Sequence, residues 1–245
     1  MIDCYDSNNW VRIKFETGQM LRDLYIEVFH RPVSFFVFDG KNAKAIRKAI
    51  YEGYKLNKTP APDNFYLMLG VFKELLLHTH HIIIDVPGYE GDDVINTLAK
   101  TQDLNILSTD RDFCALHREG ILTPMANLKG VAAHEVRLYK TLVGDTTDSI
   151  SGIVGFGRKA WESLTEEHKV QWLIFLRGGE APPSAHLGLL KPGHVVWYEK
   201  NQELLRCFWK VIGFFEIPPE LLALHIKNGT PNWARGDALL KEMVQ

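Results

Sequence analysis

Three short runs of β-branched and aromatic residues constrain the fold of this chain more than any other feature. They are Val33–Phe38 (VSFFVF), Ile82–Val86 (IIIDV) and Leu104–Leu107 (LNIL). Helical patterns occupy the stretches between and beside them, at residues 43–54, 65–77 and 92–100. Strands that alternate with helices indicate a parallel sheet covered by helices. The sequence therefore predicts an α/β fold with a mostly parallel central sheet, to which Met1–Tyr5 would add a short strand.

The chain changes character after about residue 140. No further strong strand pattern follows, whereas Lys159–Leu164, Val170–Phe175 and Gln202–Phe215 have helical patterns. We expect an α/β core over residues 1–140 and a helical region over residues 141–245.

Composition excludes several classes of protein. With 245 residues, of which 46% are hydrophobic, the chain can bury a substantial core. No apolar stretch approaches the ~20 residues of a membrane helix, and the opening residues MIDCYDSNNWVRIK do not resemble a signal peptide. Three widely spaced cysteines indicate neither a disulfide framework nor a cysteine-based zinc site. We therefore expect a cytoplasmic protein without membrane contact.

Four acidic residues each fall just past the carboxyl end of a predicted strand: Asp6, Asp39, Glu90 and Asp110. These ends share one edge of a parallel sheet, where ligands bind. A single acid at such a position is usually a helix cap. Four carboxylates at one edge would repel one another unless a cation lay among them.

Further acids extend this set: Asp92, Asp93, Asp112, Asp145 and Asp148. Such oxygen ligands suit Mg²⁺ or Mn²⁺ rather than zinc. Two such ions a few ångströms apart can stabilise the attacking and leaving oxygens during phosphodiester cleavage. Taken singly, each of these acidic motifs is also consistent with a capped helix or a polar loop.

Basic residues and glycines suggest phosphate binding. The segment from Lys41 to Lys58 has six basic residues and one acid. Gly152, Gly155 and Gly157 precede Arg158 and Lys159, and a glycine turn can present backbone N–H groups to a phosphate. A tight turn between two helices would also need glycines.

In order along the chain, these residues resemble the motifs of the 5′ nuclease (flap endonuclease) superfamily. That family includes bacteriophage 5′→3′ exonucleases and the 5′ nuclease domain of bacterial DNA polymerase I. The matching segments, between residues 5 and 160, are Asp6-Ser-Asn-Asn9, Phe38-Asp39-Gly40, Tyr54-Lys55-Leu-Asn57-Lys58, Glu90-Gly91-Asp92-Asp93, Asp110-Arg-Asp112 and Asp145-Thr-Thr-Asp148 with the glycine turn after it.

The resemblance implies a PIN-like nuclease core that uses two Mg²⁺ ions, with Mn²⁺ as a substitute. Asp6, Asp39, Glu90 and Asp92 would hold the first ion, with Asp93 close by or bridging. Asp110, Asp112, Asp145 and Asp148 would hold or orient the second. Lys55 would approach the scissile phosphate, and Tyr54 and Arg47 would help to position the reacting strand.

The resemblance also implies how DNA is bound. Residues 152–157 match a helix-turn-helix element (H3TH) that binds the duplex backbone, in the family often together with a monovalent cation such as K⁺. Arg158, Lys159, Lys48 and Lys58 would contribute positive charge. The implied substrate is DNA with 5′ ends, flaps or nicks, including RNA-primed ends, in replication, repair or recombination. We expect a monomer, encoded by a bacteriophage or a bacterium, with replication proteins as candidate partners.

The first motif departs from the family pattern. Ser7 replaces a glycine, and Asp3 offers a competing register for the first metal ligand. Two alternatives also remain at this point: a DNA-binding relative with a weakened metal site, and a PIN-type ribonuclease. A haloacid-dehalogenase-type phosphatase is disfavoured, because its Asp-x-Asp motif normally opens the chain, whereas Asp110 lies mid-chain.

Overall fold

The computed structural model describes residues 10–123, 128, 130–189 and 191–244. The chain divides into two compact units. Unit 1 consists of Met1–Lys41, Thr59–Pro87 and Pro218–Gln245, and unit 2 of Asn42–Lys58 and Gly88–Ile217. Asp6 and the short strand expected over residues 1–5 lie outside the described residues.

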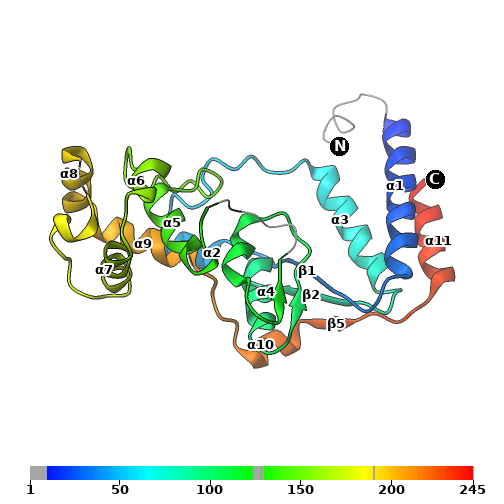
Figure 1. Ribbon diagram of the computed structural model, residues 1–245. Coiled ribbons are helices and arrows are strands. Elements are labelled where there is room, and N and C mark those ends of the chain that lie inside the picture. The colour runs from blue at the N-terminus through cyan, green and yellow to red at the C-terminus, as the bar shows by residue number, and fades with distance from the viewer. Residues whose placement is uncertain (1–9, 124–127, 129, 190, 245) are drawn as a thin grey trace. The chain divides into compact units, whose positions relative to one another are not determined.

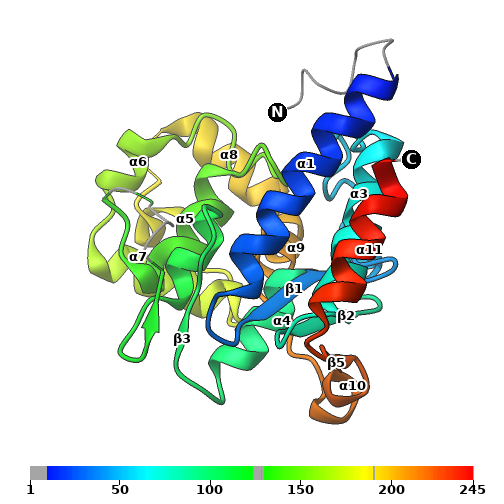
Figure 2. The ribbon, with the colours of Figure 1, turned by 90° about the vertical axis from the view of Figure 1, so that its right-hand side faces the viewer.

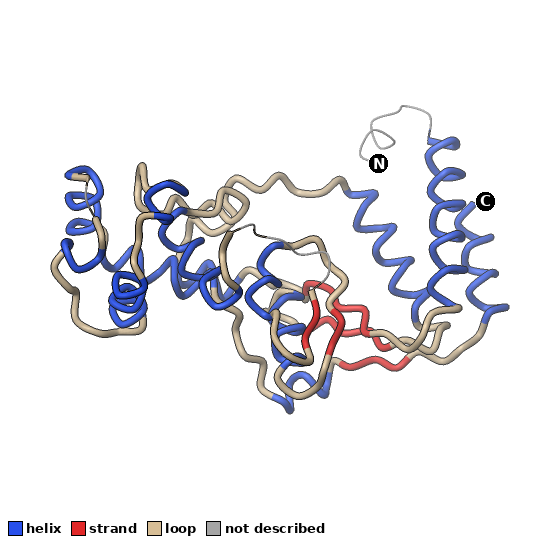
Figure 3. The backbone as a smooth tube through the Cα atoms, viewed as in Figure 1, coloured by secondary structure: helices blue, strands red, loops and turns tan. Residues whose placement is uncertain are grey.

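Unit 1 contains a three-stranded sheet in the order β1-β2-β5 (Figure 3). β1 (Phe35–Asp39) and β2 (Ile82–Val86) are parallel, with Phe35 opposite Ile82. The sequence predicted both, because an uninterrupted apolar run is typical of a buried parallel strand. β5 (Ile226–Asn228) pairs with β2 in the antiparallel direction and was not expected. Its three residues are all exposed, so it lacks an apolar pattern that would identify it.

Helices complete unit 1. α1 (Trp10–Phe29), α3 (Asp63–Leu76) and α11 (Trp233–Val244) pack side by side (Figure 1), and α10 (Pro219–Leu224) is short. Their shared core consists of Leu21, Tyr25, Leu75 and Leu240. The Tyr25 ring also stacks on Trp233, at 5.1 Å between centroids.

Unit 2 is mainly helical. Its helices are α2 (Ala45–Ile50), α4 (Gly91–Ala99), α5 (Val136–Val143), α6 (Arg158–Glu162), α7 (Glu166–Leu176), α8 (Pro192–Lys200) and α9 (Gln202–Ile212). α5 to α9 gather around one core in both ribbon views (Figures 1 and 2). Trp172, Phe175, Tyr198 and Phe208 are fully buried in it. Truncating such a buried aromatic typically costs about 3–5 kcal/mol, so this core fixes the backbone that leads into the site.

The third predicted strand does not join the first two. β3 (Leu104–Asn105) pairs in parallel with β4 (Ile121–Leu122), and these two form a separate sheet within unit 2. Only Ile106 of the predicted run is buried, and Leu107 is 69% exposed. The run is therefore too short and too exposed to extend a buried sheet. Among the described residues, the strands before Asp39 and Glu90 share one sheet, and the strand before Asp110 belongs to another.

The C-terminal end of the predicted helical region packs in unit 1, because α11 contacts α1. The functional division at residue 140 stays a prediction. Among the described residues, no helix is long and apolar enough to span a membrane.

Candidate metal centre

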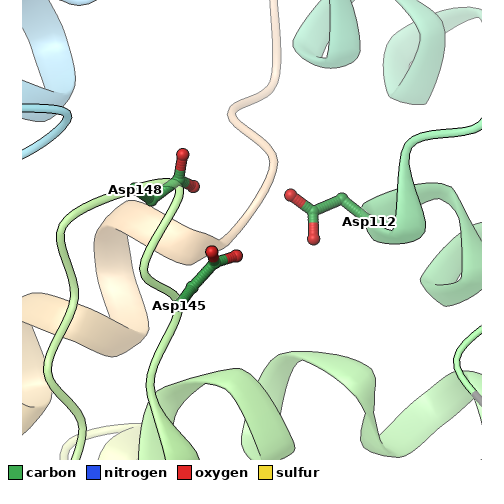
Figure 4. Close-up of side chains that lie close together, drawn as sticks. All are labelled: Asp112, Asp145 and Asp148. Carbon is green, nitrogen blue, oxygen red and sulfur yellow. The ribbon is translucent and has the colours of Figure 1, made fainter. Parts of the chain in front are cut away.

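Three of the predicted carboxylates converge in unit 2. Asp112, Asp145 and Asp148 each offer an oxygen, and these oxygens all lie within 4.8 Å of one another. Figure 4 shows Asp112 approaching from one side, and Asp145 and Asp148 from the other. Asp112 belongs to a short 3₁₀-helix (Arg111–Leu116), and the other two to the loop after α5. Three carboxylates this close form a ready site for a hard cation.

Glycine and paired backbone bonds shape the loop that carries two of them. Gly144 caps the C-terminal end of α5, and its φ of +98° is one that L side chains rarely adopt. Asp145 and Ile150 then exchange two backbone hydrogen bonds, both of 2.8 Å. The Asp145 carboxylate also accepts a bond from the Thr147 N–H at 2.9 Å. The loop is therefore closed on itself and holds Asp145 and Asp148 on a fixed backbone.

Lys140 is a member of this cluster that the motifs did not identify. It is buried, and its Nζ lies 2.7 Å from Asp145 Oδ2 and forms an ion pair with Asp112. Burial alone would raise the pKa of Asp145, but Lys140 and the local backbone N–H groups bring it below the usual value. The only available signal was a lysine in the last turn of a helix that leads into an acidic loop.

The other two acids of the cluster remain harder to ionise. Burial raises the pKa of Asp112 even though Lys140 opposes the shift. Burial also raises the pKa of Asp148 to about 6, against the opposing charge of Lys55 and with the added repulsion of Asp145 and Asp112. These carboxylates would be stabilised by a further positive charge.

A second acidic group lies at the start of α4. Glu90 is buried, and its two oxygens accept hydrogen bonds of 2.7 Å from the Tyr54 hydroxyl and the Lys55 ammonium. The same ammonium lies 3.6 Å from Asp148 Oδ1. Lys55 therefore joins the α4 acids to the cluster of Asp112, Asp145 and Asp148.

Arg47 and Asp93 form a buried bidentate pair. Both of their contacts measure 2.7 Å, and Asp93 also accepts bonds from the backbone N–H groups of Glu90 and Phe215. These contacts engage both Asp93 oxygens, which argues for a supporting role rather than a bridging ligand. Arg47 and Tyr54 are 2% and 1% exposed. Because the protein encloses them, the role that fits their place is to position the acids rather than to touch the reacting strand.

Asp92 has the least satisfied carboxylate of the group. Its Oδ1 is buried and has no hydrogen-bond partner among the described residues. Burial raises the pKa of Asp92 to about 7, and the charges of Asp93 and Glu90 add to the shift while Arg47 opposes it. The Arg47 guanidinium lies 3.9 Å from this oxygen, too far for a hydrogen bond. A buried oxygen without a hydrogen bond calls for an explanation, and metal ligation provides one.

Asp110, a further predicted ligand, has a structural contact of its own. The Asp110 carboxylate accepts a hydrogen bond of 2.9 Å from the Asp112 N–H and so caps the 3₁₀-helix. Asp39 ends β1 in unit 1 and is exposed, and its role as a ligand stays a prediction.

All but one of the predicted DNA-binding residues are exposed, and all belong to unit 2. Gly155 and Gly157 are exposed, whereas Gly152 is buried, and Gly152 and Gly155 have φ of +61° and +79°. A Cβ on Gly152 would lie 2.5 Å from Leu142 O, so only glycine fits there. The predicted basic side chains are all exposed: Lys48, Lys58, Arg158 and Lys159.

A family model for the "5'-3' exonuclease, N-terminal resolvase-like domain" matches residues 7–141. The chain belongs to the 5′-3′ exonuclease family. The match confirms the resemblance predicted from the motifs and the α/β class of the fold. Members of the family are nucleases by name, and the site described above is chemically suited to that class.

Relatives agree with this assignment over about half of the chain. The 5′-3′ exonuclease of Aquifex aeolicus is 36% identical over 149 residues, which cover 54% of this chain and 51% of the relative. DNA polymerase I of Caldicellulosiruptor bescii is 33% identical over 151 residues, which cover 52% of this chain and 18% of the relative. The chain thus spans about half of the exonuclease and less than a fifth of the polymerase.

A solved structure has a similar fold over nearly the whole chain. A structure of T5 5′-exonuclease with bound zinc ions superposes with a TM-score of 0.54, over 94% of this chain and 90% of the other. At 15% identity, this likeness concerns the fold alone.

Proposed function

We propose that this chain is a divalent-metal-dependent 5′ nuclease that hydrolyses phosphodiester bonds near the 5′ ends of DNA. Exonucleolytic trimming and flap cutting are both within its proposed activity. The single observation that carries the proposal is the convergence of Asp112, Asp145 and Asp148 next to the Lys55–Glu90 pair. Membership of the 5′-3′ exonuclease family supports it.

The donor set fits Mg²⁺, with Mn²⁺ as a substitute. It consists of carboxylate oxygens, the ligands that Mg²⁺ prefers. It includes Oδ1 of Asp92, which has no hydrogen-bond partner among the described residues and lies 3.9 Å from Arg47 Nη2. The proposed ligands are Asp6, Asp39, Glu90 and Asp92 for one ion, and Asp110, Asp112, Asp145 and Asp148 for the other. When bound, two such ions stabilise the attacking and leaving oxygens of a phosphodiester.

The protein's own side chains would prepare this chemistry. Tyr54 and Arg47 hold the Glu90 carboxylate in place through contacts of 2.7 and 3.2 Å. Lys140 does the same for Asp112 and Asp145. Lys55, which is partly exposed, can turn from Glu90 toward a phosphoryl oxygen and stabilise the negative charge that develops there.

Residues 141–245 would make many of the contacts that bind DNA. We propose that the turn at residues 152–157 acts as the H3TH element and binds the duplex backbone, with K⁺ as its monovalent cation. Lys48, Lys58, Arg158 and Lys159 would add contacts to phosphates. Residues 1–140 would form the nuclease core. The proposed setting is a monomer in the cytoplasm that removes RNA-primed or displaced 5′ ends during replication, repair or recombination, beside replication proteins.

The decisive experiment compares 5′-flap, nicked and blunt DNA duplexes and an RNA-primed duplex, each with Mg²⁺ and with EDTA. We expect cleavage in Mg²⁺ alone, and product lengths will separate junction cuts from stepwise trimming. Asp145→Asn should remove cleavage and leave duplex binding measurable. Binding without cleavage in every metal would instead identify a DNA-binding relative, and cleavage restricted to RNA would identify a PIN-type ribonuclease.

A further inference from the structure

His194 has a buried imidazole ring to which no role has been given so far. It is the third residue of α8 and is 4% exposed. Among the residues that the structure describes, none forms a hydrogen bond with its ring. Its ring nitrogens are not among the buried side-chain atoms that lack a partner in the described residues, so a group outside the protein can reach them. It also lies beyond residues 5–160, where the sequence motifs end.

The ring faces the glycine turn. Its centroid lies 5.4 Å from that of Phe156, which is buried beneath the turn. A Cβ placed on Gly155 would lie 3.6 Å from Nε2 of His194, with no other atom closer. Nε2 therefore lies beside Gly155, next to the space that a side chain would fill there.

The same part of the turn is open to solvent. Val154, Gly155 and Gly157 are exposed, while Ile153 and Phe156 anchor the turn in the core. Phe156 uses its N–H within the turn by donating to Ile153 O at 2.8 Å. A phosphate oxygen resting on Gly155 would come within reach of a donor at Nε2. The exposed Lys191, directly before α8, adds a positive charge three positions before His194 in the sequence.

We propose that His194 is a DNA-contacting residue whose Nε2–H donates to a backbone phosphate of the duplex bound at the 152–157 turn. This inference rests on the proposed DNA binding of that turn and extends it to α8. Because the partner is a phosphate, the contact would add affinity without base preference.

The test measures binding of fluorescein-labelled duplexes of two unrelated sequences in EDTA, so that no cleavage occurs. His194→Phe keeps a ring against Phe156 but removes the donor, whereas His194→Gln keeps a donor. Hydrogen bonds to charged groups are strong, so we expect the Phe variant to bind both duplexes about tenfold more weakly and the Gln variant to lose much less. His186→Phe, the same change at an exposed position, should bind as the parent does.

A second measurement uses the unaltered protein, so that its result does not depend on whether a variant folds. With ¹⁵N-labelled histidine, duplex addition should shift the ring resonances of His194 and leave those of His186 in place. Equal affinity of parent and His194→Phe, or an unmoved His194 resonance with bound duplex, would overturn the proposal while Mg²⁺-dependent cleavage persists. A parent protein that neither binds nor cleaves duplexes would overturn the proposed function itself.

Discussion

The backbone N–H of Lys55 donates to the carbonyl oxygen of Asp148 at 2.9 Å, and the Lys55 ammonium lies 3.6 Å from a carboxylate oxygen of the same residue. Lys55 and Asp148 are far apart in sequence, yet a backbone hydrogen bond and a side-chain ion pair connect their segments. A second link, from the Asn57 N–H to Ser149 Oγ at 3.2 Å, lies beside the first. The position of the Lys55 cation is therefore set by the loop that carries the candidate metal ligands.

Lys55→Ala should lower the single-turnover cleavage rate by ~10²-fold or more, the scale seen when a donor to the developing charge is removed. Flap affinity should fall far less, because other basic residues share the backbone contacts. Lys58→Ala, at an exposed position three residues on, should instead lower the affinity for DNA and make that affinity less dependent on salt concentration. Equal effects of the two substitutions on rate and affinity would mean that Lys55 is merely part of the basic surface.

Asp92→Asn should stabilise the metal-free protein and abolish Mg²⁺-dependent cleavage. In metal-free buffer at pH 7.5, the substitution removes a buried carboxylate whose Oδ1 has no hydrogen-bond partner among the described residues. Relief of about 1 kcal/mol would raise Tm by ~3 °C for a domain of this size. The readout is differential scanning calorimetry in EDTA.

Asp85→Asn is the matched control for this substitution. Its carboxylate pairs with Lys73 and Lys227 at 2.9 and 3.1 Å, and these lysines hold its pKa below the usual value. The same chemical change should therefore lower Tm. A fall in Tm for Asp92→Asn as well would show that Asp92 is satisfied by the protein alone.

Breaking the Arg47–Asp93 pair should be far more costly than breaking an exposed pair. Arg47→Ala leaves the Asp93 carboxylate buried without its partner, for which about 3–5 kcal/mol is typical. Arg158→Ala removes an ion pair to Glu162 in which both side chains are about half exposed, and it should cost far less, because solvent screens exposed pairs. Urea unfolding of the two variants measures both values, and similar losses would contradict the structural role given to Arg47.

The sequence was informative where one physical requirement dominated. The run of isoleucines in β2 can be stable only when buried, so its bounds were predicted without error. The acidic loop of Asp145 and Asp148 was also recognisable, because a helix end, two carboxylates and a glycine turn follow one another directly.

Prediction was weaker where tertiary contacts decide the outcome. α1 was not expected, although Leu21, Tyr25 and Val28 have the spacing of a buried helix face. β5 is an exposed strand defined only by its pairing with β2. Lys140 and the Arg47–Asp93 pair depend on buried ion pairs between distant residues, which residue spacing along the chain does not encode.

The last prediction concerns pH and His81, which is fully buried in unit 1. Its Nδ1 accepts a hydrogen bond from the Ser34 N–H at 3.1 Å, and its Nε2 lies 2.7 Å from the Val28 carbonyl oxygen. This arrangement requires the neutral ring, and burial lowers the pKa of His81 below its ordinary 6.5. Below pH 6.5 the unfolded chain therefore binds the proton more readily than the folded one, so the free energy of unfolding should fall as the pH drops from 7.5 to 5.5.

His81→Gln should flatten the plot of Tm against pH over this range, whereas His186→Gln, at an exposed histidine, should leave it unchanged. A His81→Gln profile as steep as that of the parent would assign the acid sensitivity to other groups.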